Sequence, residues 1–101
     1  MALAGGVVTT QTVNTPAIVS GATALAANNN RLGWAIQNVG TNPLFVLLGS
    51  GATSSVFHFV IKGGSANSDG NGGSLVFMSG AVYNGIVTIA GTSPLYTVTE
   101  I

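Results

Sequence analysis

The sequence predicts an all-β protein: a single antiparallel β-sandwich or barrel, jelly-roll-like or immunoglobulin-like, with an extended N-terminal arm. Short runs rich in valine, isoleucine, threonine and aromatic residues recur along all 101 residues. Turn residues (glycine, asparagine and proline) separate these runs about every 8–12 residues, which is the spacing typical of sandwiches and barrels. No run has the length and composition of a stable helix. The pattern therefore fixes the class but leaves jelly-roll and immunoglobulin-like topologies open.

The chain is short enough to be one domain, and we divide it into an arm, residues 1–20, and a sandwich, residues 21–101. Residues 7–13 have strong β propensity but poor alternation, which favours an extended arm or an edge strand that lies on another surface. Pro16 suits such an edge because proline cannot donate to a sheet. Residues 22–27 are bounded by turn residues and predict a turn or short strand.

The densest apolar sequence lies between Arg31 and Lys62, where we expect most of the core. In residues 31–39 the large side chains Leu32, Trp34 and Ile36 alternate with smaller or polar ones. This period of two predicts a half-buried strand with those three residues on its inner face.

Two further strands are predicted in the same stretch. Residues 44–48 are continuously apolar, which indicates a central strand covered on both sides. Residues 56–61 predict the next strand, with Phe57, Phe59 and Ile61 on one face.

The last third of the chain continues the same alternation of strands and turns. Strands are expected at residues 75–78 and 81–83, followed by Asn84-Gly85, a dipeptide typical of tight hairpin turns. Residues 86–90 and 95–101 complete the predicted set, with Thr97 and Thr99 facing away from Tyr96 and Val98 in the final strand.

A glycine-rich segment, residues 63–74, is the longest break and predicts an exposed, mobile loop. Within it Asn67, Asp69 and Asn71 alternate as oxygen donors, a spacing compatible with a weak calcium site. One carboxylate is few for such a site, so a solvated loop is the more economical interpretation.

Charged residues make up only 4% of the chain: Arg31, Lys62, Asp69 and Glu100, with a net charge of zero. A small domain with this composition tends to associate, which favours a surface covered in an oligomer or larger assembly over a soluble monomer with a Ser/Thr/Asn surface. Two cations cannot neutralise a nucleic-acid backbone or form a basic membrane-binding face, so neither partner is expected. The beginning of the chain lacks the cationic and apolar regions of a secretory signal, and there is no cysteine.

The sequence predicts no enzyme and no cofactor. Its two carboxylates, Asp69 and Glu100, are distant in sequence, and His58 is the single histidine. No serine lies in a nucleophile-elbow motif that could use that histidine. The same scarcity of ligands argues against a closed zinc site.

Two binding hypotheses remain. Exposed Trp34, Tyr83 and Tyr96 would be able to stack on sugar rings in a receptor- or glycan-binding adhesin module. In the other hypothesis the uncharged surface is buried in a symmetric assembly, which also accounts for the arm.

Two segments carry a resemblance to a known family: RLGWAIQNVGTNPLFVLLGSGA at residues 31–52 and GAVYNGIVTIAG at residues 80–91. An arginine, an aromatic strand with Ile-Gln-Asn, a Gly-Thr-Asn-Pro turn and an apolar strand ending in Gly-Ser-Gly resemble a pattern in small virion proteins of tailed bacteriophages. The resemblance implies a capsid decoration (cement) protein, with a fibre or tail adhesin as the alternative. It carries no catalytic motif.

What the resemblance implies is a β-rich homotrimer on the outer capsid surface of the virion, assembled in the host cytoplasm. There it would bridge major capsid protein subunits and resist the pressure of packaged DNA. Combined with the composition, this assigns assembly contacts to the arm and to two charged residues: Val7, Val8, Thr9, Thr10, Gln11, Thr12, Val13, Arg31 and Glu100. Arg31 and Lys62 are expected to pair with Glu100 or Asp69, within a subunit or across an interface.

Overall fold

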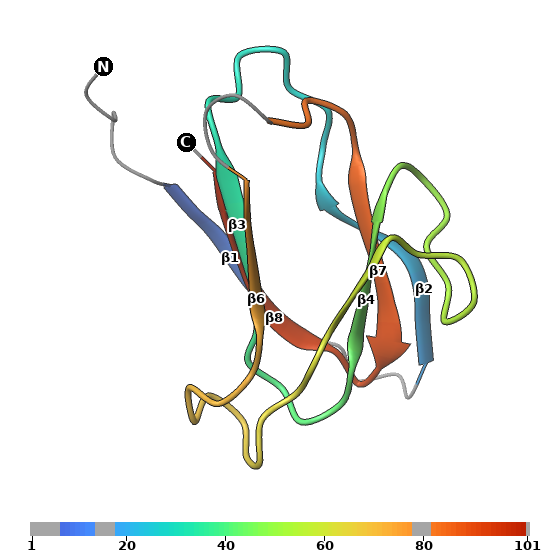
Figure 1. The fold of residues 1–101 in the computed structure, drawn as a ribbon, viewed down its shortest axis with the longest axis vertical. Coiled ribbons are helices and arrows are strands. Elements are labelled where there is room, and N and C mark those ends of the chain that lie inside the picture. The colour runs from blue at the N-terminus through green and yellow to red at the C-terminus, as the bar shows by residue number, and fades with distance from the viewer. Residues whose placement is uncertain (1–6, 14–17, 78–81, 101) are drawn as a thin grey trace.

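The fold is a sandwich of two four-stranded antiparallel sheets, seen edge-on in Figure 1. The computed structural model describes residues 7–13, 18–77 and 82–100. Sheet A has the order β1-β8-β3-β6 and sheet B the order β2-β7-β4-β5. The strand bounds are β1 Val7–Val13, β2 Ile18–Leu25, β3 Trp34–Asn38, β4 Leu44–Leu48, β5 Phe59–Ile61, β6 Ser74–Phe77, β7 Val87–Thr92 and β8 Leu95–Glu100. The predicted all-β sandwich is confirmed.

The strand order decides between the two topologies that the sequence left open. Only β4 and β5 are both consecutive in the chain and neighbours in a sheet. All other connections between consecutive strands of the described chain cross from one sheet to the other, so β1 and β2 lie on opposite sides of the sandwich. An immunoglobulin-like domain instead pairs its first two strands within one sheet. Eight strands in the order 1-8-3-6 facing 2-7-4-5 form a jelly roll.

The core lies between the sheets and follows the pleat of the strands. Trp34 and Ile36 of β3 and Val98 of β8 face Val46 of β4 and Ile89 of β7, and all five are almost completely buried. In β8 the predicted alternation is confirmed, because Tyr96 and Val98 are buried while Thr97 and Thr99 are half-buried. These apolar inner faces hold the sheets together by burial.

The predicted strand at residues 31–39 is shorter in the structure, where β3 begins at Trp34. Leu32 therefore does not join Trp34 and Ile36 on the inner face: it is exposed, while Arg31 is buried. Arg31 and Leu32 lie outside the strand, where the pleat no longer fixes the direction of a side chain, so the predicted alternation does not hold for them.

The strand covered on both sides is β7 and not β4. Phe45 and Leu47 on the outer face of β4 are only half-buried, whereas Thr88 and Ala90 on the outer face of β7 are buried. A loop, residues 49–57, lies over β7 and β2 and provides this cover, outside sheet B in Figure 1. β4 is nevertheless an interior strand of its sheet, as predicted.

The predicted strand at residues 56–61 contains only β5, Phe59–Ile61. A turn precedes it, in which Thr53 Oγ1 accepts the backbone N–H groups of Ser55 and Val56. Because of that turn Phe57 does not share the inner face with Phe59 and Ile61 but is 38% exposed.

Asn84-Gly85 does not form the predicted hairpin. The segment joins β6 of sheet A to β7 of sheet B, and Val82 and Tyr83 are not in a strand. The carbonyl groups of this connection instead accept hydrogen bonds from residues 28–31, so tertiary contacts replace hairpin pairing. Residues 78 and 81 of the two predicted strands lie outside the described residues.

The two N-terminal strands lie in different sheets, β1 in sheet A and β2 in sheet B. β1 pairs antiparallel with β8 and forms an edge of sheet A. Of the two alternatives predicted for residues 7–13, an extended arm or an edge strand, the structure shows the edge strand. β2 begins at Ile18 and pairs with β7, so the expected boundary after residue 20 falls within a strand. Pro16 lies outside the described residues. No helix in the described part of the chain has the length and apolar character needed to cross a membrane.

Candidate functional site

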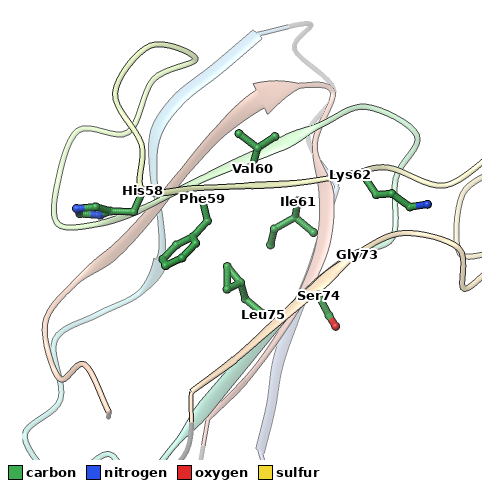
Figure 2. A pocket seen from close by; sticks show the side chains of 8 residues that line it. All are labelled: His58, Phe59, Val60, Ile61, Lys62, Gly73, Ser74 and Leu75. Carbon is green, nitrogen blue, oxygen red and sulfur yellow. The ribbon is translucent and has the colours of Figure 1, made fainter.

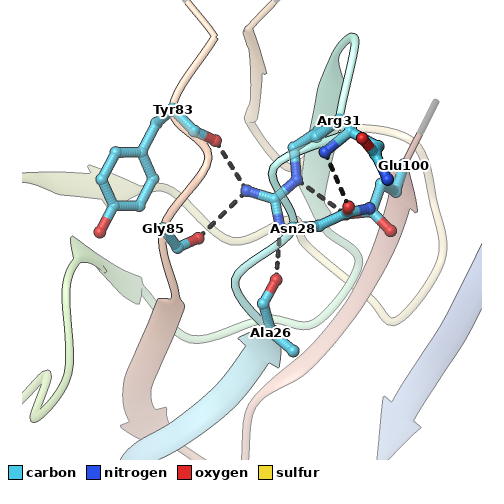
Figure 3. Close-up of polar contacts among 7 residues, drawn as sticks. Ala26, Asn28, Arg31, Tyr83, Gly85 and Glu100 are labelled. Atoms are coloured by element: carbon cyan, nitrogen blue, oxygen red, sulfur yellow. Dashed lines mark hydrogen bonds and ion pairs between the residues drawn. The ribbon is translucent and has the colours of Figure 1, made fainter.

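Arg31 lies at the centre of a polar cluster, shown in Figure 3. Its Nε–H donates to Glu100 Oε2 at 2.7 Å. Nη1 donates to the carbonyl oxygens of Tyr83 (2.7 Å) and Gly85 (3.1 Å), and Nη2 donates to that of Ala26. Four of the five guanidinium N–H groups are thus used, which permits the charge to be buried.

This cluster joins the β2–β3 connection, the β6–β7 connection and the end of β8. The structure brings together two of the predicted assembly residues, Arg31 and Glu100, and pairs them within one chain. The guanidinium is fully buried, whereas the Glu100 side chain is 24% exposed. Glu100 also lies opposite Val7 in the pairing of β8 with β1, so the beginning of the predicted arm adjoins the cluster.

The other predicted assembly residues, 7–13, form β1 along one side of β8. The register shifts between Val8 and Thr10, which marks a bulge. Since β1 is the last strand of sheet A in the described chain, its outer edge is open to pairing.

Asp69 organises the glycine-rich loop from within. Its carboxylate accepts the backbone N–H groups of Ser65, Ala66 and Asn71, each at 2.9 Å, and the side-chain amide of Asn71. These hydrogen bonds lower the pKa of Asp69 below its usual value, and the one from the Asn71 backbone has the largest effect. The loop is exposed, as predicted, but it is hydrogen-bonded internally and to residues 39–40.

The same contacts bear on the calcium interpretation. An ionised carboxylate has about four lone-pair positions, and N–H donors already occupy that many on Asp69, so few remain to coordinate a cation. Among the described residues there is no group of three or more His, Cys, Asp or Glu that can hold a metal ion.

His58 has a structural role at the start of β5. Its Nδ1 accepts the backbone N–H of Leu48 at 3.0 Å, and its own backbone N–H donates to Val46 at 2.8 Å. An imidazole whose Nδ1 accepts carries its proton on Nε2. The histidine thus fastens the end of β4 to the segment that leads into β5.

The aromatic residues of the adhesin hypothesis are mostly inside. Trp34 stacks on Phe77 with ring centroids 4.8 Å apart and is 1% exposed. Tyr96 is also buried, and Tyr83 is half-buried. Buried rings cannot stack on sugars, so Trp34 and Tyr96 are not available for the adhesin hypothesis.

A different surface stands out on the outer face of sheet B, where three apolar side chains gather around Phe45. Val60 is its cross-strand neighbour, Phe57 packs on its ring at 5.0 Å between centroids, and Ile18 lines a hollow of about 130 Å³ beside it. Ile18 is 76% and Val60 50% exposed. We call Ile18, Phe45, Phe57 and Val60 the outer apolar face.

No charged residue interrupts this surface. None occurs in β2, β4, β5 or β7, and none occurs in the loop at residues 49–57. Sequence reasoning missed the outer apolar face because it placed Phe57 on the same strand face as Phe59 and Ile61. The available signal was that Phe45 and Val60 occupy outward positions of two apolar strands. If the two strands are taken as neighbours, the alternation along each places both side chains on the same face of the sheet.

A second hollow, about 540 Å³, lies between β5 and β6, the last strands of the two sheets on this side. Phe59, Ile61 and Leu75 point into it, as Figure 2 shows, and Lys62 lies at one end. Ile61 is buried, while Phe59 and Leu75 are half-buried. We call this hollow the β5–β6 groove; its position where two open edges face each other was not predicted.

No family model, curated protein or solved structure matches the chain. The class defined by the geometry is thus a jelly-roll β-sandwich with an uncharged, partly apolar exterior.

Proposed function

We propose that this protein is a structural virion protein that binds the outside of an icosahedral phage capsid and stabilises it, as a decoration (cement) protein. The observation that carries the proposal is the outer apolar face. Exposed apolar clusters that no charge interrupts are typical of surfaces covered by another protein. In the proposal, the shell covers this face of the protein at every position where a copy binds.

The charge distribution supports the same conclusion. Two of the four charged residues, Arg31 and Glu100, neutralise each other within the fold, and Asp69 is engaged by its own loop. The exterior therefore presents few ionic groups that would oppose burial in an assembly. Jelly rolls also build many viral capsid domains, although a fold alone does not define a function.

The open edge of β1 supplies a second contact. An edge strand can add to a neighbouring sheet through main-chain hydrogen bonds, which depend little on side-chain chemistry. In the proposal, residues 7–13 contact a sister subunit or the major capsid protein, and three chains form a homotrimer. Modest individual contacts suffice because many copies bind one repetitive shell.

The test is co-sedimentation of purified protein with shells of the encoding phage from which it has been removed. Val60→Lys places a charge on the outer apolar face, and we expect it to weaken shell binding at least about tenfold because a buried, unpaired lysine is costly. Val76→Lys is the matched control, since Val76 is 60% exposed on the edge strand of the other sheet. It should bind like the original protein.

Equal binding of both lysine variants would exclude the outer apolar face as the contact, and absence of any binding to shells would refute the decoration function. Deletion of residues 2–13 tests the arm, but it also removes the strand beside β8. Its unfolding midpoint must therefore be measured in parallel. Light scattering of the free protein should give three times the chain mass, and a monomer at high concentration would contradict the homotrimer.

A further inference from the structure

We infer that the β5–β6 groove binds an extended, acidic segment of a partner protein, which adds to the free edge of β6 as a further strand. The inference rests on the proposed function only for the origin of that segment, the capsid subunit. The chemistry of the groove is independent of it.

The backbone on both sides of the groove is available for strand pairing. β5 and β6 end their sheets in the described chain, so each presents a row of main-chain groups without a strand partner. They meet at one end, where Gly73 N–H donates to Lys62 O at 2.9 Å, and diverge around the groove. A ligand that satisfies a row of strand N–H and C=O groups is itself a strand.

The floor of the groove is apolar. Phe59 and Ile61 from sheet B and Leu75 from sheet A converge between the strands (Figure 2). Phe59 is held there by an edge contact with Phe77, 5.9 Å between ring centroids. Since side chains of a strand alternate, every second residue of the occupant would point onto this floor. Small branched apolar residues fit that requirement.

The groove has a positive charge at one end. Lys62 lies at the end of the groove and has no ion-pair partner among the described residues. The two carboxylate side chains of the protein are engaged elsewhere: Glu100 by Arg31, and Asp69 by its loop. A second copy therefore offers no free acidic side chain from the described residues, so the occupant is a segment of a different protein that carries Asp or Glu near one end.

The probe is the blocked peptide acetyl-Asp-Ser-Val-Thr-Val-Ser-amide, titrated into ¹⁵N-labelled protein and followed by NMR. We expect chemical-shift changes confined to residues 58–62 and 73–77. Lys62→Glu should weaken binding about two- to fivefold, the effect of one partly exposed ion pair. The same variant should prefer the peptide with lysine in place of aspartate.

Leu75→Ala and Val76→Ala form a matched pair, because Leu75 points into the groove whereas Val76 faces solvent. The first should weaken peptide binding at least about fivefold by removing part of the floor, and the second should not change it. The spectrum of each free variant verifies that it is folded.

Three results would overturn the inference: no shift changes at millimolar peptide, changes located away from β5 and β6, or equal affinity of Lys62→Glu for the aspartate and lysine peptides. Peptide binding without shell binding would refute the proposed function alone. Shell binding without peptide binding would refute the groove alone.

Discussion

Arg31 and Glu100 lie 69 positions apart in the chain, yet the Arg31 Nε–H donates to Glu100 Oε2 at 2.7 Å. The pair closes one end of the sandwich, because the same guanidinium also binds carbonyl groups of the β2–β3 and β6–β7 connections. In a chain with four charged residues, half of the charge is thus committed to holding loops together.

Replacement of Arg31 by methionine should cost about 3–5 kcal/mol of unfolding free energy, because it leaves Glu100 and several loop carbonyl groups without their donor. Urea unfolding followed by the fluorescence of Trp34, the single tryptophan, measures the loss. Lys62→Met is the control and should stay within about 0.5 kcal/mol, since Lys62 is exposed. A loss below about 1 kcal/mol for Arg31→Met would show that the cluster is not a main source of stability.

Thr88 fastens the loop at residues 49–57 to sheet B. Its Oγ1 donates to Gly49 O at 2.6 Å and accepts Ala52 N–H at 3.2 Å. Thr88→Val keeps the shape but leaves both backbone groups unpaired, so we expect a loss of about 1–3 kcal/mol.

Thr23→Val provides the matched control, because Thr23 is the cross-strand neighbour of Thr88 but is exposed. Hydrogen exchange at the Ala52 amide gives a local reading of the same contact. Unchanged exchange in Thr88→Val would mean that the loop is held by packing alone.

Asn38 joins three backbone groups at the far end of the sandwich. Its Nδ2 donates to Asn42 O (2.8 Å) and Ile61 O (2.9 Å), and its Oδ1 accepts Gly40 N–H (2.9 Å). The side chain is 1% exposed, so Asn38→Ala should lower the unfolding free energy by at least about 2 kcal/mol. Asn67→Ala, in the exposed loop, should have little effect, and equal unfolding midpoints for the two variants would contradict the prediction.

Asp69 should make the stability of the glycine-rich loop dependent on pH. Its pKa is lowered in the folded protein, so its contribution is complete above the unfolded pKa of about 4 and is lost as pH falls through the lower folded value. The difference in unfolding midpoint between the original protein and Asp69→Asn should therefore be largest near neutral pH. Below about pH 4 it should narrow, and a difference that stays constant down to pH 2 would exclude this contribution.

Sequence patterns predicted the class of fold because burial follows the strand period wherever a strand is regular. Trp34 and Ile36 are predicted on the inner face of their strand on that basis, and both are buried. Tyr96 and Val98 are predicted on the face opposite Thr97 and Thr99, and the structure shows that theirs is the buried face. The prediction failed where a strand ended sooner than its apolar residues did. Leu32 and Phe57 are apolar but lie outside β3 and β5, so no pleat directs them inward.

Local alternation, turn residues and composition are properties of neighbouring positions, so they are sufficient to predict an all-β sandwich with few charged residues. Three-dimensional packing set the jelly-roll order, the pairing of Arg31 with Glu100, the outer apolar face and the β5–β6 groove. Each of these depends on which strands become neighbours across the two sheets. Alternation along a single strand carries no information about that choice, since the same pattern satisfies any partner strand with a matching inner face.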